Sequence, residues 1–237
     1  MIVGSWHICV LVPARNEEEL LPRCLDSIAA ACAVLPRTVT FDVIVGVDSS
    51  SDRTCEIAER MLAGCGTVVT TEARAVGRVR SLATNAALQR VAGPLRRSWL
   101  ANTDADCFVP HNWLFDQLNA ASEGVEAIAG TVDVDSFCEH RPGVDSIFRR
   151  KYLIHPDGSH PHVHGANLGV RADAYIKAGG WGHLETGEDH DLWNRLSKTG
   201  ARTRSSSAIT VRTSGRRIGR APNGFAEALA AHNELVA

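Results

Sequence analysis

The sequence lacks the marks of several protein classes. Its seven cysteines are odd in number, scattered, and include no Cys-x-x-Cys pair. This pattern argues against a disulfide framework or a cysteine-based zinc site, and it is typical of small core residues in a reducing compartment. A basic excess is also absent, because 25 Lys and Arg residues face 27 Asp and Glu residues and leave a formal net charge of -2. Binding to nucleic acid through its phosphates is therefore not expected.

Long apolar runs are missing too. The longest, from Ile28 to Leu35, is too short for a transmembrane segment, and the N-terminus lacks the basic and apolar regions of a signal peptide. We therefore predict a cytoplasmic protein. The 237 residues, 44% of them hydrophobic, can bury one large core, and no linker or repeat indicates a second domain.

Apolar runs alternate with amphipathic segments through the first half of the chain. Strands are predicted at residues 8–12, 41–47 and 67–71, where the runs are continuously apolar or β-branched. Helices are predicted at residues 21–32, 54–62 and 77–91, the second capped by Asp52 and the third with Leu82 facing inward. This rhythm predicts a parallel sheet with right-handed crossovers.

The second half is less regular. It predicts helices over residues 111–121, 141–153 and from Glu188 to Gly200, and strands over residues 127–134, 165–170 and 208–213, with a sharp turn at residues 179–181. The fold class predicted for the whole chain is α/β, a single Rossmann-like domain with a mostly parallel central sheet flanked by helices.

Two carboxylates separated by one small residue, Asp104 and Asp106, end the fourth apolar run. On an extended backbone they share one face. Carboxylate oxygens are ligands that Mg²⁺ and Mn²⁺ prefer. Asp48 ends a neighbouring strand, and ligands of open α/β sheets gather at the carboxyl ends of strands. The alternative interpretation is a solvated turn.

Two other groups offer potential metal ligands. Asp133 and Asp135 form a second Asp-x-Asp, and four histidines lie close together in the segment that ends at residue 164. No cysteine or carboxylate stands beside these histidines at a familiar zinc spacing, so a polar loop is favoured over a metal site. The histidines are His155, His160, His162 and His164.

Five segments, taken together, resemble the family 2 glycosyltransferases, which have the GT-A fold. They are residues 12–18, 47–54, 102–106, 165–171 with 179–181, and 187–192, in the order of the family and across nearly the whole chain. The second segment is shorter than the common form and lacks its usual glycine. The resemblance implies transfer of a sugar from a nucleoside-diphosphate sugar to an acceptor hydroxyl, with inversion and with Mg²⁺ or Mn²⁺ as cofactor.

The resemblance also divides one domain, residues 1–237, into a nucleotide-binding half up to about residue 110 and an acceptor-binding half from about residue 111. It implies nucleotide contacts from Pro13, Arg15, Glu17, Asp48, Arg80 and Asp104, and metal contacts from Asp104 and Asp106. It implies acceptor contacts from His164, Gly165, Asn167, Trp181 and Asp191.

Asp189 is the expected general base, because an inverting displacement needs a carboxylate that takes the proton of the acceptor hydroxyl. Glu188 or Asp191 could share that role, and the alternative is that all three only favour a helix N-terminus. For Arg80 the alternative is an exposed helix arginine. The basic tail either covers the diphosphate or is solvated; its members are Arg212, Arg216, Arg217 and Arg220.

Two other functions are compatible with parts of the sequence. A sugar-nucleotide nucleotidyltransferase should carry a glycine-rich basic loop after its first strand, whereas residues 13–18 are acidic and contain no glycine. A non-catalytic nucleotide-sugar-binding homologue would usually lack one of the carboxylates. The sequence predicts neither the donor sugar and its base, nor the oligomeric state, nor whether the acceptor is a small molecule, a glycan or a lipid-linked compound.

Overall fold

The computed structural model describes residues 5–220 and 224–236, and its described strands form one seven-stranded sheet. The strands are β1 (Trp6–Ala14), β2 (Val39–Asp48), β3 (Gly66–Thr71), β4 (Ser98–Asn102), β5 (Ala127–Val134), β6 (Leu168–Arg171) and β7 (Thr203–Thr213). Their order across the sheet is β3-β2-β1-β4-β6-β5-β7. Only β6 runs antiparallel, to β4 and β5. The predicted mostly parallel sheet is confirmed.

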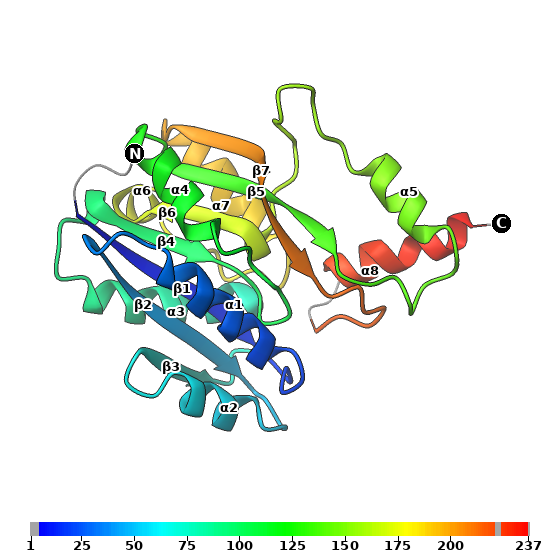
Figure 1. Ribbon diagram of the computed structural model, residues 1–237, viewed down its shortest axis with the longest axis horizontal. Helices are drawn as coiled ribbons and strands as arrows, with labels where there is room; N and C mark the ends of the chain where they lie inside the picture. The colour runs from blue at the N-terminus through cyan, green and yellow to red at the C-terminus, as the bar shows by residue number, and fades with distance from the viewer. Residues whose placement is uncertain (1–4, 221–223, 237) are drawn as a thin grey trace.

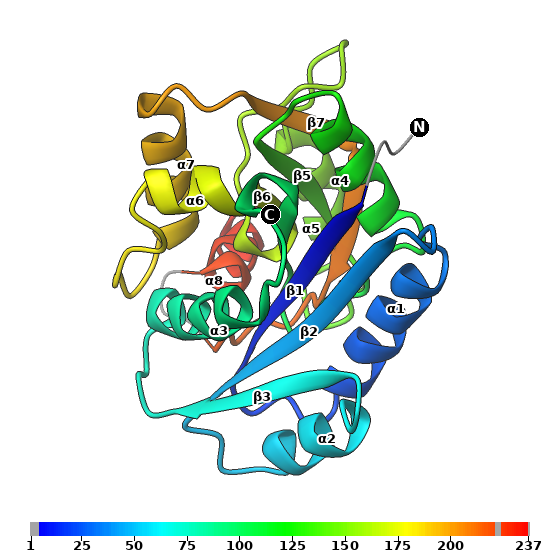
Figure 2. The same cartoon turned by 90° about the vertical axis from the view of Figure 1, so that its left-hand side faces the viewer.

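Helices cover both faces of this sheet (Figure 2). One face carries α1 (Leu21–Ala33), α2 (Thr54–Met61) and α4 (Trp113–Ser122), and the other carries α3 (Val76–Arg90), α6 (Ala172–Lys177) and α7 (Glu188–Lys198). Two more helices, α5 (Val144–Lys151) and α8 (Phe225–Ala230), lie beyond the ends of β5 and β7 (Figure 1). Short 3₁₀ turns occur at η1 (Leu95–Arg97), η2 (Gly165–Asn167) and η3 (Ala231–Leu235).

The first strand shows why its sequence is apolar without interruption. Ile8, Val10 and Val12 pack into the core under α1, α2 and α4. Cys9 and Leu11 point the other way and pack into the core under α3, α6 and α7. Successive side chains of a strand alternate between faces, so a sheet covered on both sides needs apolar residues at every position.

Two local predictions were wrong. Leu82 was expected to face inward but is 40% exposed, because α3 presents Val79 and Ala83 to the sheet instead. The predicted strand over residues 165–170 begins with the η2 turn, and only Leu168–Arg171 pairs as β6. In both places the sequence pattern is short and ambiguous, and tertiary packing decides the outcome.

Strained backbone is concentrated at one edge of the sheet. Among the described residues, the non-glycine positions with positive φ are Asn16, Ser49 and Arg74. They follow β1, β2 and β3 respectively, so all three lie in loops at the carboxyl ends of parallel strands. A left-handed conformation costs a non-glycine residue about 1–2 kcal/mol, and such strain clusters at functional sites. This edge of the sheet is therefore the first place to search for a binding site.

None of the helices in residues 5–220 and 224–236 combines the length and apolar character that a bilayer-spanning segment requires.

Candidate active site

A cavity of about 280 Å³ opens at the carboxyl ends of β1, β2 and β4. The ends of these strands and the loops that follow them supply most of the residues expected to contact a nucleotide or a metal. Those residues are Pro13, Arg15, Glu17, Asp48, Asp104 and Asp106. The structure thus brings together parts of the chain that lie about ninety residues apart in sequence, as expected for an α/β sheet.

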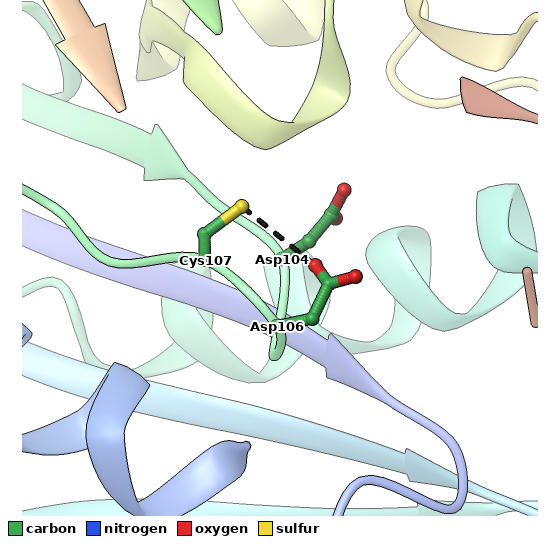
Figure 3. A group of neighbouring side chains, drawn as sticks. All are labelled: Asp104, Asp106 and Cys107. Carbon is green, nitrogen blue, oxygen red and sulfur yellow. Dashed lines mark hydrogen bonds between the residues drawn. The ribbon is translucent and has the colours of Figure 1, made fainter. Parts of the chain in front are cut away.

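Asp104 and Asp106 lie on the loop that follows β4, with their carboxyl groups close together (Figure 3). Cys107 completes a cluster whose possible ligand atoms lie within 4.8 Å of one another. The Cys107 thiol is fully buried, and burial holds its pKa well above the usual range. A protonated thiol is a poor ligand for a hard cation, so the two carboxylates are the donors that fit Mg²⁺ or Mn²⁺.

Arg216 places a cation beside one of these carboxylates. Its Nη2 lies 2.7 Å from Asp106 Oδ2 and 2.9 Å from Glu17 Oε2. Burial alone would lower the pKa of this guanidinium, but the two carboxylates outweigh it and the net shift is upward. The guanidinium is therefore a stand-in for a positive charge at Asp106, which supports the fit of a metal cation there. Of the tail arginines, Arg217 and Arg212 are exposed and Arg220 reaches the carbonyl oxygen of Asn16.

Asp48 is held at the end of β2 by two donors. Its Oδ1 accepts hydrogen bonds from the Ser49 hydroxyl at 3.2 Å and from the backbone N–H of Arg74 at 3.0 Å. Both donors belong to residues with positive φ, 47° and 50°. The strained loops thus orient a carboxylate that lines the cavity. Arg53 occupies the N-cap position of α2, but the predicted capping bond comes from Asp52: its carboxylate accepts the backbone N–H of Thr54, the first residue of the helix, and the backbone N–H of Glu18.

Arg80 is not an exposed helix residue. Its guanidinium is 2% exposed and pairs with two carboxylates, through Nη2 to Asp104 at 2.5 Å and through Nε to Glu188 at 3.3 Å. Its Cζ lies 5.3 Å from the ring centroid of Trp181, in cation–π geometry. Burial favours the neutral form, yet Asp104 and Glu188 leave the pKa of Arg80 raised. The buried cation links the β4 loop to the start of α7.

The carboxylates that Arg80 joins are themselves perturbed. Burial raises the pKa of Asp104, and the charge of Asp106 adds to this, while Arg80 opposes it; 36% of the Asp104 side chain stays accessible from the cavity. Burial likewise raises the pKa of Glu188, again against the effect of Arg80. Of the two, Asp104 lines the cavity, and a group with a shifted pKa in a cleft is typical of a functional site.

Asp189 is oriented by backbone donors. Its Oδ2 accepts the N–H of Gly165 at 2.8 Å, and its Oδ1 accepts the N–H of His190 at 2.7 Å. Gly165 is required at this point, because a Cβ there would meet the Arg80 guanidinium at 2.5 Å. The η2 turn therefore packs directly against Arg80 and holds Asp189 at the same time.

The residues expected to contact an acceptor separate into two groups. His164 and Gly165 lie next to Asp189, as described. Asn167 is 1% exposed, with its amide bonded to the indole of Trp113 and to backbone carbonyl oxygens of β5 and β7. Trp181 is buried under Arg80, and Asp191 pairs with Arg195 on the outer part of α7. Asn167 and Trp181 are buried and line neither described cavity, whereas the Asp191 side chain is 36% exposed, and its contact with an acceptor stays a prediction.

The second Asp-x-Asp does not join the cluster. Asp135 accepts from Arg23 at 2.8 Å, and Asp133 lies 4.0 Å from Arg149. Sequence reasoning did not find Arg74 and Phe225, which line the cavity from the loop after β3 and from α8. An isolated arginine and an isolated phenylalanine carry no pattern that could have identified them.

Fold and site together define a class of protein: an α/β domain with a cavity, lined by several carboxylates and arginines, at the carboxyl ends of its parallel strands. The sequence matches the family described as glycosyltransferase like family 2 over residues 6–230. The chain therefore belongs to that family. Among the curated proteins, none matches this sequence significantly.

Solved structures with the GT-A fold resemble this one. TarS of S. aureus (residues 1–349), in complex with UDP-GlcNAc, is 17% identical with a TM-score of 0.66 over 92% of this chain and 61% of that one. The mannosyltransferase PcManGT of Pyrobaculum calidifontis, in complex with GDP-Man and Mn²⁺, is 20% identical with a TM-score of 0.65 over 98% and 70%. GalNAc-T7 with UDP, GalNAc and Mn²⁺ is 13% identical with a TM-score of 0.62 over 90% and 44%. The chain spans about 60% of the length of the TarS fragment.

Proposed function

We propose that this protein is a metal-dependent, inverting glycosyltransferase that moves a sugar from a nucleoside-diphosphate sugar to an acceptor hydroxyl. One observation carries the proposal: Arg80 joins the carboxylate pair of the β4 loop to the acidic start of α7. Glycosyl transfer needs one set of groups that binds the leaving diphosphate and a second set that takes the proton of the attacking hydroxyl, on opposite sides of the reacting carbon.

On the donor side, Asp104 and Asp106 would hold a divalent cation, and Asp48 would accept hydrogen bonds from the base or the ribose. A metal bound there supplies electrostatic stabilisation of the charge that develops on the diphosphate. Arg216 lies where its fork can bind phosphate oxygens once it leaves Glu17 and Asp106. The resemblance to structures that contain UDP-GlcNAc or GDP-Man with Mn²⁺ supports donors of these kinds.

On the acceptor side, Asp189 would take the proton of the attacking hydroxyl. The bond between the sugar and the diphosphate breaks as the new glycosidic bond forms on the opposite face, and the diphosphate leaves with the electron pair. Gly165 and His190 keep the Asp189 carboxylate in place through their backbone N–H groups, so little reorganisation is needed at the moment of transfer.

A thermal-shift experiment tests the proposal. The protein is melted with Mn²⁺ and UDP, GDP, UDP-GlcNAc or GDP-mannose, and at least one nucleotide at about a hundred times its Kd should raise Tm by roughly 5–10 °C. Asp106→Asn should lose the metal-dependent part of this shift. Asp133→Asn is the matched control from the second Asp-x-Asp and should keep it. Well-folded protein that no nucleotide stabilises would contradict the proposal.

A further inference from the structure

A second cleft, of about 260 Å³, lies between α5 and α8. Phe148 and Tyr152 contribute to it from α5 and the residue after it, and Phe225 and Leu229 contribute from α8. These two helices stand beyond the ends of β5 and β7, away from the helices that cover the sheet (Figure 1). Tyr152 and Phe225 also pack against the core under α1, α2 and α4, so the cleft lies at the margin of that core.

Aromatic rings form the wall of this cleft. The rings of Phe148 and Phe225 meet edge to face with centroids 6.1 Å apart, and those of Phe148 and Tyr152 are tilted with centroids 5.2 Å apart. Phe148 and Leu229 also pack with Val134 in a small core of their own. The wall is therefore held in place from behind. Apolar side chains that line an open cleft favour an apolar occupant.

The cleft adjoins the proposed active site at two points. Phe225 lines both cavities. His164 lines the second, and the next residue, Gly165, donates its backbone N–H to Asp189. The cleft wall at His164 is thus one residue away from the backbone N–H that holds Asp189, although Asp189 itself lines neither cavity.

His164 contributes to the cleft as an uncharged ring. Its Nε2 lies 2.9 Å from the Tyr152 hydroxyl, within hydrogen-bond distance, and that hydroxyl also accepts the backbone N–H of Val132 at 3.0 Å. Burial lowers the pKa of His164 to about 4, and the ring is neutral at physiological pH. The ionisable lining residues besides His164 and Tyr152 are Lys151 and His232, and no described lining residue is acidic. The positive charge of Lys151, with no acidic partner in the lining, disfavours a cationic occupant relative to a neutral or anionic one.

We infer that this cleft binds an apolar substituent of the acceptor molecule, of about the size of one ring, while the acceptor hydroxyl itself stays free to react. The acceptor is then an alcohol or glycoside with an aromatic or short alkyl substituent rather than an unsubstituted sugar. The inference rests on the proposed function for the position of the acceptor. Its basis in the structure is the continuity of an apolar cleft with the residues that hold Asp189.

Binding of simple glycosides tests the inference. The probes are phenyl, hexyl and methyl β-glycosides of glucose, galactose and mannose, with saturation-transfer NMR as the readout, in the presence of Mn²⁺ and UDP or GDP. The Kd of a phenyl or hexyl glycoside whose aglycone enters the cleft should be lower than that of the methyl glycoside of the same sugar by about tenfold or more. The phenyl and hexyl arms distinguish a ring from an alkyl chain, and a preference for either supports the inference.

Ala228 allows the cleft to be filled without touching its core, because this residue is exposed on α8 and lines the cleft. Ala228→Phe should abolish the preference for the larger aglycone. Ala231→Phe is the matched control, since Ala231 is also exposed but lines neither cavity, and it should bind as the wild type does. Melting temperatures of both variants verify that they fold.

Equal affinity for methyl and larger glycosides, no binding of any phenyl or hexyl glycoside, or an unchanged preference in Ala228→Phe would each overturn the inference. Nucleotide binding separates this failure from failure of the proposed function. If a nucleotide raises the Tm of the protein but the glycosides show no aglycone preference, the inference about the cleft is refuted and the proposed function is not. An aglycone preference that depends on Ala228, without any nucleotide effect, refutes the glycosyltransferase proposal and leaves a binding cleft.

Discussion

Arg80→Met removes the charge of the buried guanidinium and keeps an unbranched stem in its place. Wild-type Arg80 pairs with both Asp104 and Glu188. Without it, the buried Glu188 and the partly accessible Asp104 lose the cation that they share. Removing one partner of a buried ion pair costs about 3–5 kcal/mol. That is a large part of the total stability of a typical domain, about 5–15 kcal/mol.

The loss should depend on pH in a defined direction. Burial already raises the pKa values of Asp104 and Glu188 in the folded protein, and Arg80 holds both down. In Arg80→Met the two pKa values rise further above those of the unfolded chain. At pH values between the ordinary carboxyl pKa and the raised pKa of the folded protein, the folded state binds more protons than the unfolded state. The free energy of unfolding of the variant therefore falls as the pH rises through this range. The variant should be less impaired at pH 5 than at pH 8.

Urea unfolding of wild type and variant at pH 5, 7 and 8 measures both effects. Arg78→Met is the matched control, because Arg78 is exposed on the same helix and its loss should stay within about 0.5 kcal/mol. Arg80→Lys should lie between wild type and Arg80→Met, since one ammonium group cannot reproduce the fork that spans two carboxylates. A loss below about 1 kcal/mol in Arg80→Met, or the same loss at pH 5 and pH 8, would refute the assignment of Arg80 as a buried link.

Three further predictions concern the proposed chemistry and its surroundings. Asp189→Asn should lower turnover by about 10²–10⁴-fold while nucleotide-induced stabilisation is retained, and normal turnover would exclude Asp189 as the base. Arg216→Gln should bind Mn²⁺ more tightly by calorimetry when nucleotide is absent, because the guanidinium no longer competes for Asp106; unchanged affinity would contradict metal binding at that carboxylate. Burial lowers the pKa of His164 to about 4, so the unfolded chain binds a proton at this residue before the folded protein does, and stability is lost as the pH falls from about 6.5 to 4. In His164→Gln the free energy of unfolding should therefore vary less steeply with pH in this range, by the equivalent of up to one bound proton. An unchanged slope in His164→Gln would show that the ring is not held neutral.

Much of the fold could be predicted because its strands are apolar on both faces. The strand over Ala127–Val134 has the predicted bounds, and β1 and β2 differ from prediction only at their ends. The helix predicted from Leu21 begins there, with Pro22 in its first turn. The predictions failed where periodicity is weak. The η2 turn, Gly165–Asn167, leads directly into the apolar residues of β6, and a Cβ at Gly165 would meet the Arg80 guanidinium.

The site could be predicted in its parts but not in its connections. The sequence pattern placed Asp48, Asp104 and Asp106 at strand ends, and all three line one cavity. The pattern could not distinguish the buried Arg80 from a solvated helix arginine, because its partners lie 24 and 108 residues away. For the same reason Arg216 could not be placed beside Glu17, which is 199 residues distant in sequence. Contacts of this kind depend on how the sheet brings its loops together.

The position of Arg80 has a consequence for how the two sides of the site act on each other. Its pKa is raised by Asp104, by Glu188 and also by Asp189. One buried cation therefore interacts with a carboxylate on the donor side and with the proposed base on the acceptor side. Carboxylates of the β4 loop and of the start of α7 are thus joined through a single side chain, which a solvated arginine on the surface of α3 could not achieve.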